Sequence, residues 1–425
     1  MRMRAAKFID QLAETKGQFG AGAAARTAGL LEKLQRTRLR EPSDLIRLHE
    51  VALFLRAYPQ SARVMRLADE ILFSFADRLP ADHEPFADPD ISGIAGTVIS
   101  TNFSFEFARS LLARHASDVS IDWENFEHPE RLAPVLRRLI PESRDDWAVE
   151  AYPDWRGWFE RGRGSVRWLL DHMTPEIYDL IEIPLRWEPG TASRSHLRIA
   201  RSKIFYHDGP FLKREPNLLA KTFAAPAEPR EILGAASACK IVDVIVDASA
   251  VRYRELYGFL HPDLARIEYS DLGRGVDLFL FGPALEQQLP VRDYLCGMFF
   301  KNGVPAGYVE GLIRDANMEV GFNLYYTFRD GETAWLYAML LKVLHERSGV
   351  KSFSVDPYQI GHENEEAIES GAFWFYRKLG FAPESEEIWR LLAREERRIA
   401  AQPGYRTPAA TLRKLAASRL VWAAL

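Results

Sequence analysis

The sequence contains only two cysteines among its 425 residues, Cys239 and Cys296. Two thiols so far apart in the chain indicate neither a disulfide framework nor a thiolate metal site. The ten histidines show neither H-x-x-x-H nor H-E-x-x-H spacing, which are common patterns of zinc ligands on a helix. We therefore expect no structural or catalytic metal.

Long apolar runs are also missing. No segment approaches the ~18 consecutive apolar residues of a membrane-spanning helix, and Met1–Lys16 is charged, without the apolar core of a signal peptide. The formal net charge of -4 provides no bulk attraction to nucleic acid, because phosphate binding needs clustered Lys and Arg. We expect a soluble, cytoplasmic protein with no membrane partner.

Hydrophobic residues make up 47% of the chain, and its length is sufficient for two or three folded domains. From Arg4 to about His172 the apolar residues recur at helical spacing, as in Leu45–Leu55. The stretch 181–224 mixes extended and helical patterns, and 231–258 indicates one or two helices. The pattern predicts a mostly α-helical N-terminal domain over residues 1–245.

Alternating apolar residues dominate the next part of the chain, where Asn302-Gly303 forms the dipeptide that a type I′ hairpin turn demands. The predicted elements, in order, are strand Val276–Phe281, hairpin strands Tyr294–Phe300 and Val304–Ile313, strand Met318–Thr327, a helix from Gly331 to Ser348, strand Val350–Val355 and helix Glu365–Leu379. This order predicts an α/β domain with a mixed sheet over residues 246–390. Residues 391–425 are charged and are predicted to form a helical tail.

The most specific motif lies in the last predicted helix of this domain. Residues Ala372–Phe381 read A-x-x-F-Y-x-K-L-G-F. The motif and the order of elements before it resemble the GNAT superfamily of acyl-CoA-dependent N-acyltransferases, over roughly a third of the chain. The resemblance implies a fold in which the acyl carrier lies between two parallel strands that splay apart, here Met318–Thr327 and Val350–Val355.

The resemblance implies acetyl-CoA or another acyl-CoA as co-substrate. Splayed strands leave main-chain groups free for the amides of the pantetheine arm, and Tyr325, Tyr326 and Thr327 would offer those groups. The pyrophosphate would bind the following loop and helix start, where Arg329, Gly331 and Thr333 match or adjoin the family's Q/R-x-x-G-x-G/A positions.

Two features of the loop depart from the family pattern. Phe328 occupies the first position, and Asp330 and Glu332 place carboxylates near the expected pyrophosphate, which raises the electrostatic cost of binding an anion. Acidic residues at the start of a helix also have an ordinary role, since they complement the helix dipole.

Further site residues follow from the resemblance. Tyr376 matches the tyrosine that protonates the departing thiolate, and a buried structural tyrosine is the alternative. Glu319 is the candidate general base, with Glu310 and Asp356 as alternatives. Glu369 occupies a position where the family often has Asn, so Asn364 is either the carrier contact or the cap of the next helix.

These residues together predict transfer of an acyl group from a thioester carrier to a small-molecule or peptide amine. One alternative keeps the fold but uses aminoacyl-tRNA as donor, which would need a basic face such as the cluster within Arg161–Arg167. The other is a non-catalytic binding or scaffold protein, whose cleft would be filled by its own side chains.

Overall fold

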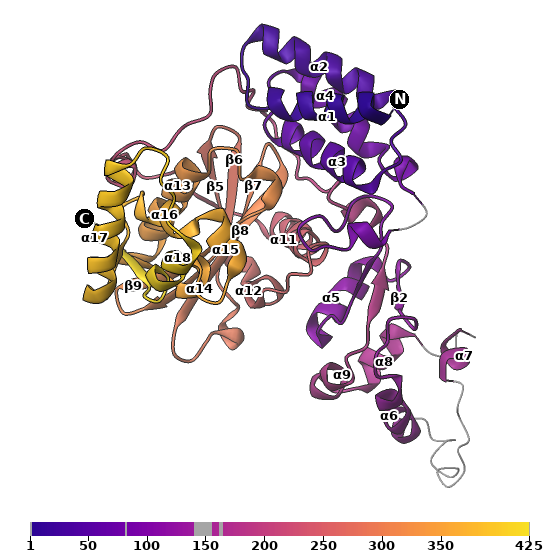
Figure 1. The fold of residues 1–425 in the computed structure, drawn as a ribbon. Helices are drawn as coiled ribbons and strands as arrows, with labels where there is room; N and C mark the ends of the chain where they lie inside the picture. Colours follow the sequence, from indigo (N-terminus) through magenta and orange to yellow (C-terminus); the bar gives the residue numbers. More distant parts are fainter. Residues whose placement is uncertain (1, 81–82, 140–154, 161–164, 425) are drawn as a thin grey trace.

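The computed structural model describes residues 2–80, 83–139, 155–160 and 165–424. Three parts follow one another along the chain: a group of N-terminal helices, a small unit built around three short strands, and a large mixed sheet covered by helices (Figure 1). None of the helices in these ranges is both long enough and apolar enough to cross a membrane.

The N-terminal part is helical, as predicted. Its helices are α1 (Arg2–Thr15), α2 (Ala21–Gln35), α3 (Pro42–Ala57) and α4 (Ala62–Phe73). Pro42 occupies the first turn of α3, where the missing N–H costs no helical hydrogen bond. Ser61 caps α4 by accepting a hydrogen bond from the Val64 N–H at 3.3 Å.

The second unit contains a sheet that the sequence did not predict. Its strands β1 (Ile99–Thr101), β2 (Val119–Ile121) and β3 (Leu185–Trp187) pair antiparallel in the order β1-β3-β2. Three-residue strands are too short to show an alternating pattern. The helices of this unit are α5 (Phe105–His115), α6 (Leu132–Leu139), α7 (Trp155–Glu160), α8 (Val166–His172) and α9 (Pro175–Ile181).

The large sheet confirms the predicted α/β class with a mixed sheet. Nine strands lie in the order β11-β12-β10-β9-β8-β7-β6-β5-β4, and every neighbouring pair is antiparallel except β9 with β10. The strands are β4 (Glu231–Ile232), β5 (Glu268–Gly273), β6 (Val276–Phe281), β7 (Asp293–Lys301), β8 (Val304–Arg314), β9 (Asn317–Leu324), β10 (Ser352–Val355), β11 (Ala382–Pro383) and β12 (Leu420–Ala423).

The predicted hairpin and the helix after β9 are present. Asn302 and Gly303 join β7 to β8 with φ of 48° and 81°, as a type I′ turn requires. Helix α13 (Thr333–Ser348) ends at Gly349, whose φ of 68° is the left-handed conformation of a glycine C-cap. The predicted helix 365–379 is instead divided into α15 (Glu365–Ser370) and α16 (Ala372–Arg377) at Gly371.

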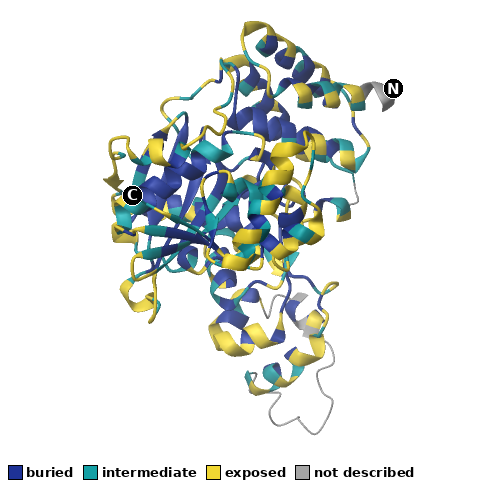
Figure 2. Ribbon diagram, turned by 60° about the vertical axis from the view of Figure 1, so that its left-hand side comes forward, coloured by how far each residue is buried: buried dark blue, intermediate teal, exposed yellow. Residues whose placement is uncertain are grey.

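Helices cover both faces of the sheet. On one face, Tyr337 of α13 packs against Phe322 of β9, with a ring-centroid distance of 5.0 Å. On the other face, Phe259 of α12 packs against Tyr308 of β8 at 6.2 Å. The helices not yet given are α10 (Leu218–Phe223), α11 (Ala235–Ala250), α12 (Tyr257–Leu260) and α14 (Pro357–Ile360). Buried residues concentrate in the sheet and the facing sides of these helices (Figure 2).

The tail, expected to be helical, begins with α17 (Glu386–Ala401) and α18 (Ala409–Leu415) but ends in β12. This last strand lies between β10 and β11, and all four of its residues pair with β10. Its four residues offer too little alternation to identify a strand from the sequence. The segment after residue 390 is therefore part of the sheet domain.

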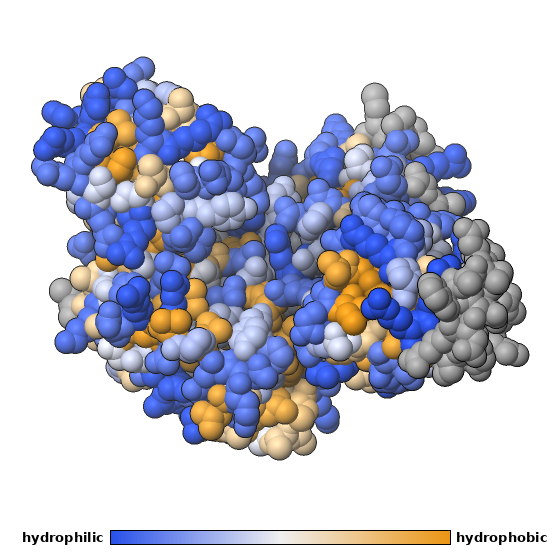
Figure 3. All heavy atoms as spheres, turned by 90° about the horizontal axis from the view of Figure 1, so that it is seen from below, coloured by the Kyte–Doolittle hydropathy of each residue, from blue (hydrophilic) through white to orange (hydrophobic). Residues whose placement is uncertain are grey.

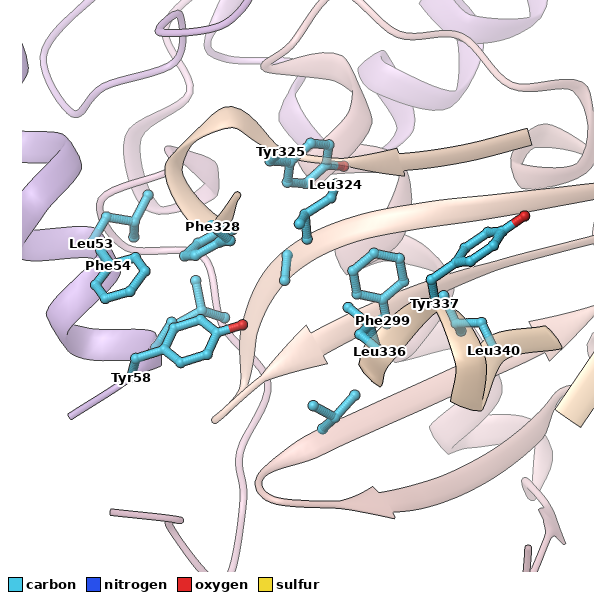
Figure 4. Close-up of a cluster of buried hydrophobic side chains, with 14 of the residues drawn as sticks. Leu53, Phe54, Tyr58, Phe299, Leu324, Tyr325, Phe328, Leu336, Tyr337 and Leu340 are labelled. Atoms are coloured by element: carbon cyan, nitrogen blue, oxygen red, sulfur yellow. The ribbon is translucent and has the colours of Figure 1, made fainter. Parts of the chain in front are cut away.

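The N-terminal helices pack against the loop that follows β9. Phe54 and Tyr58, at the end of α3, lie beside Phe328 in an apolar cluster that continues to Tyr337 of α13 (Figure 4). His207 joins the same region, with its ring 5.2 Å from that of Tyr58. The loop between β9 and α13 is thus held from outside the sheet domain.

His207 gives the protein an acid-sensitive element. Its ring is buried and, among the residues that the structure describes, neither ring nitrogen has a hydrogen-bond partner. Burial, Lys301 and Arg274 lower its pKa from 6.5 to about 2. Below about pH 6.5 the histidine is protonated in the unfolded chain but stays neutral in the folded protein. The free energy of unfolding therefore decreases as pH falls below about 6.5. Between pH 7.5 and 5 this loss is about 2 kcal/mol.

We expect His207→Phe to remove that loss, so that the free energy of unfolding changes about 2 kcal/mol less over this pH range than in the wild type. Urea unfolding at both pH values measures it. His362→Phe, at an exposed position, is the matched control and should behave like the wild type. Equal acid sensitivity of wild type and His207→Phe would rule out this role for His207.

Candidate functional site

Strands β9 and β10 separate after a short paired segment. They pair only through Asn317–Ser352, Met318–Phe353 and Glu319–Ser354, whereas β9 continues to Leu324. The chain leaves β10 after Val355 and enters α14 at Pro357. The second half of β9 thus has β8 on one side and, within the described part of the chain, no strand on the other.

Alternate residues of β9 direct their backbone N–H and C=O groups into this gap. The Tyr325 N–H donates to the Ala306 carbonyl at 3.0 Å, so Tyr325 and every second residue before it face β8. Leu324, Phe322 and Val320 consequently turn their N–H and C=O groups towards the gap.

Gln359 of α14 occupies part of the gap with its side-chain amide. Its Nε2 donates to the Val320 carbonyl at 3.0 Å, and its Oε1 accepts from the Phe322 N–H at 3.3 Å. The amide satisfies groups that a neighbouring strand would otherwise satisfy. An amide group thus fits between the backbone groups at this position. A pantetheine arm carries amide groups as well.

The expected backbone contacts at Tyr325, Tyr326 and Thr327 need correction. Strand β9 ends three residues earlier than predicted, and residues 326–328 form a 3-10 turn. The Tyr325 ring lies beneath the Arg252 guanidinium at 3.8 Å, and Thr327 Oγ1 accepts from Arg194 at 3.0 Å. Tyr326 is 57% exposed. None of the three lines the cavity in the gap, which is lined instead by Gly321 to Leu324 of β9.

A cavity of about 590 Å³ fills the gap and extends to both faces of the sheet. Four residues expected at the site line it, namely Arg329, Thr333, Asn364 and Tyr376, together with Glu310. The other lining residues are Arg254, Tyr308, Gly321, Phe322, Asn323, Leu324, Tyr358, Gln359, Glu366, Ala367, Ser370, Ala372 and Phe375. The face of the molecule seen in Figure 3 is mainly hydrophilic, with several hydrophobic patches.

Tyr376 lies at the wall of the cavity formed by α16. Its ring packs against Tyr337 at 5.5 Å and against Phe381 at 5.9 Å, which fixes its orientation. Burial raises the pKa of the Tyr376 phenol well above its usual value, so the hydroxyl keeps its proton at neutral pH. A protonated phenol at a cavity wall can serve as a general acid.

The loop before α13 turns its carboxylates away from the cavity. Asp330 pairs with Lys16 of the N-terminal part at 2.7 Å, and buried Glu332 accepts from Arg274 Nε at 2.9 Å. Neither carboxylate lines the cavity. The repulsion that the sequence predicts between these two carboxylates and a bound pyrophosphate therefore does not apply to a ligand in the cavity.

Arg329 and Thr333 remain on the cavity side of the loop. The Arg329 guanidinium pairs with Glu366 at 2.8 Å, but both side chains are largely exposed, so this pair is weak. In the described ranges no side-chain hydrogen bond caps the start of α13, which leaves amides of its first turn for an anion.

Gly331 has a different role from the one expected. A Cβ built at Gly331 would lie 2.6 Å from the ring of Tyr58. The glycine permits close packing of the N-terminal part on the loop, rather than close approach of a ligand. Its position in the family-like motif thus does not identify a phosphate contact.

Glu310 is the carboxylate that the structure places in the cavity. It accepts a hydrogen bond from the Tyr294 hydroxyl, and burial raises its pKa above the usual value of 4.5. Glu319 lies on the same sheet face, opposite Leu312, but does not line the cavity. Asp356 caps α14 by accepting from the Tyr358 N–H at 2.8 Å.

Asn364 lines the cavity, yet both polar atoms of its side chain are engaged. Its Oδ1 accepts from the Ala367 N–H at 3.1 Å, which caps α15, and its Nδ2 donates to the Tyr358 carbonyl at 3.1 Å. The structure therefore favours the capping role for Asn364.

Sequence reasoning missed Arg254, Gln359 and the pair Tyr308–Asn323 at this site. Arg254 follows α11 in a segment with no motif, and Gln359 is one polar residue in a short helix. The alternation of side chains along the predicted strand does place Tyr308 and Glu310 on one face of the sheet. This alternation is the sequence signal that could have identified Tyr308 as a neighbour of Glu310.

No family model matches this chain, and comparisons with curated proteins and with solved structures likewise found no match.

Proposed function

We propose that this protein is an N-acyltransferase that moves an acyl group from a thioester carrier, such as acetyl-CoA or a longer acyl-CoA, to an amine. The observation that carries the proposal is the cavity between the separated strands β9 and β10, with Glu310 and Tyr376 in its walls. The motif Ala372–Phe381 and the strand order around the gap agree with a GNAT-like domain. We place the reaction in the cytoplasm.

The residues divide the reaction between them. The thioester would enter from the α13 side, where Arg329, Thr333 and the uncapped start of α13 suit its phosphates. Glu310 would take a proton from the amine on the other side of the sheet, and the amine would attack the thioester carbonyl directly. The C–N bond forms, the C–S bond breaks, and Tyr376 protonates the thiolate.

One observation favours the scaffold alternative. Gln359 already hydrogen-bonds two backbone groups in the gap, which a carrier would share or displace. For the aminoacyl-tRNA alternative, residues 161–164 of the basic cluster lie outside the described residues.

Calorimetric titration with acetyl-CoA and with longer acyl-CoAs tests the proposal. We expect binding, together with amine-dependent release of free thiol. Absence of both binding and release at millimolar ligand would contradict the proposed function and favour the scaffold alternative.

Tyr376→Phe is expected to lower kcat by about 10²-fold at unchanged KM, because it removes only the proton donor. Tyr337→Phe is the matched control, since that hydroxyl is buried without a hydrogen-bond partner among the described residues and lies outside the cavity lining. Steady-state release of free thiol measures both variants. Equal kcat values for the two would remove Tyr376 from the mechanism.

A further inference from the structure

Arg254, an exposed residue, brings a positive charge to the Glu310 side of the cavity. It lies between α11 and α12, the helices that cover the sheet face carrying Tyr308 and Glu310. Within residues 2–80, 83–139, 155–160 and 165–424, no hydrogen bond or ion pair engages its guanidinium. An arginine in a cavity without a carboxylate partner is suited to bind a ligand's carboxylate.

Tyr308 provides a second donor beside Arg254. Its hydroxyl accepts a hydrogen bond from Asn323 Nδ2 at 3.2 Å, which leaves the phenolic proton free to donate. Burial raises the pKa of Tyr308, and the nearby charge of Arg254 opposes that rise. Arg254 and Tyr308 both line the cavity, so that one carboxylate bound there can reach both.

The spacing to Glu310 links this pair to the reacting amine. Tyr308 and Glu310 are two residues apart on β8, so their side chains leave the same face about 7 Å apart along the strand. A ligand held at Arg254 and Tyr308 presents an amine to Glu310 only if its amine and carboxylate are a few bonds apart.

On the basis of the proposed function, we infer that the acceptor is a free amino acid, whose carboxylate is bound by Arg254 and Tyr308 and whose amine is deprotonated by Glu310. The reaction consumes the amino acid and the thioester and releases an N-acyl amino acid and a free thiol. The amino acid enters with an ammonium group, so its nitrogen loses two protons. One is released to solvent before attack, Glu310 takes the other as the C–N bond forms, and Tyr376 delivers one proton to sulfur as the C–S bond breaks.

Carboxylates in the cavity lining bear on specificity. Glu310 and Glu366 both line the cavity. These carboxylates disfavour a second negative charge on the acceptor. We therefore expect neutral amino acids to bind better than acidic ones.

Direct binding of free amino acids and of the matching amino-acid amides to the full chain tests the inference. Calorimetric titrations are made alone and with coenzyme A present, so that ordered binding is covered. We expect amino acids to bind and their amides to bind about 10- to 100-fold more weakly, because the amide loses a charge-assisted contact. Arg254→Met should abolish this preference, and Arg254→Lys should retain part of it.

The outcomes separate the two proposals. A protein that binds or acylates amino-acid amides as well as amino acids overturns the acceptor class alone, as does an unchanged preference in Arg254→Met or a lack of amino-acid binding. Thioester binding is titrated separately, and a protein that binds amino acids but no thioester overturns the proposed function. Arg347→Met, in the surface pair with Glu268, is the control variant and should leave the preference intact.

Discussion

Replacement of Glu310 by Gln is expected to lower the rate of acyl transfer by about 10²- to 10⁴-fold, while thioester binding stays unchanged. The glutamine has nearly the same shape and can still accept the hydrogen bond from Tyr294. It cannot take a proton from the attacking amine. The variant therefore removes the base without opening a cavity.

Glu319→Gln is the matched control for this prediction. Both glutamates lie on one face of the sheet, but only Glu310 lines the cavity. Steady-state kinetics of the two variants discriminate between them. Loss of activity in Glu319→Gln with normal activity in Glu310→Gln would restore the base predicted from the sequence.

The pH dependence supplies an independent readout. Burial raises the pKa of Glu310, so kcat/KM is expected to rise with pH through that raised value as the base ionises. Tyr294→Phe removes a hydrogen bond to the ionised carboxylate and should move the rise to higher pH. A profile that does not move would show that the observed ionisation belongs to another group.

Arg194→Met is expected to lower the free energy of unfolding by about 3–5 kcal/mol, because it leaves the carboxylate of Glu50, whose side chain is only 12% exposed, without its counter-charge. Arg194 Nη2 donates to both Glu50 oxygens, at 3.0 and 2.9 Å, and to Thr327 Oγ1 at 3.0 Å. Although burial opposes ionisation, Arg194 and the hydrogen bond from His49 lower the pKa of Glu50 to about 2. The cluster ties α3 to the loop behind the cavity.

Urea unfolding at pH 7 measures this loss. The pKa of Glu50 is lower in the folded than in the unfolded state, so its contribution is present above about pH 4.5 and is lost as pH falls towards 2. Arg194→Met should lack that acid-dependent part. The double variant Arg194→Met with Glu50→Gln should recover part of the stability, since no buried charge remains.

A surface arginine provides the comparison. Arg198 pairs with Asp69 at 3.2 Å while 40% exposed, so Arg198→Met is expected to cost less than about 1 kcal/mol. If Arg194→Met were as mild as Arg198→Met, the proposed role of the cluster would be wrong.

The same cluster contains a Ser–His–Glu arrangement that resembles the catalytic triad of a hydrolase. Ser195 Oγ lies 2.9 Å from His49 Nε2, and His49 Nδ1 lies 3.0 Å from Glu50 Oε1. Both Ser195 and His49 are fully buried, and the serine oxygen also accepts from the Ala95 N–H. A substrate has no access to the serine, so we interpret the arrangement as structural.

Much of the sheet domain could be predicted because its signals are local. The Asn302-Gly303 turn, the alternation of Val276–Phe281 and the glycine end of α13 each depend on a few neighbouring residues. Elements defined by distant pairing could not be found in this way. Strands β1, β3 and β12 have three or four residues each and exist only because remote segments meet.

The sequence could predict which segments form the site. It could not predict which way individual side chains point. The sequence brought Arg329, Thr333 and Tyr376 to one cavity. It could not tell that Asp330 and Glu332 find cations elsewhere, since Lys16 and Arg274 are remote in sequence. It likewise could not show that Gly331 faces Tyr58.

The position of β12 affects how the sheet is completed during synthesis. Strands β5 to β10 are all made before residues 420–423, yet β12 must insert between β10 and β11. Until then a nascent chain exposes β10 as an unpaired edge, and such edges promote association between chains. Molecular chaperones that shield strand edges would therefore be most useful to this protein in the interval between translation of Val355 and that of Leu420.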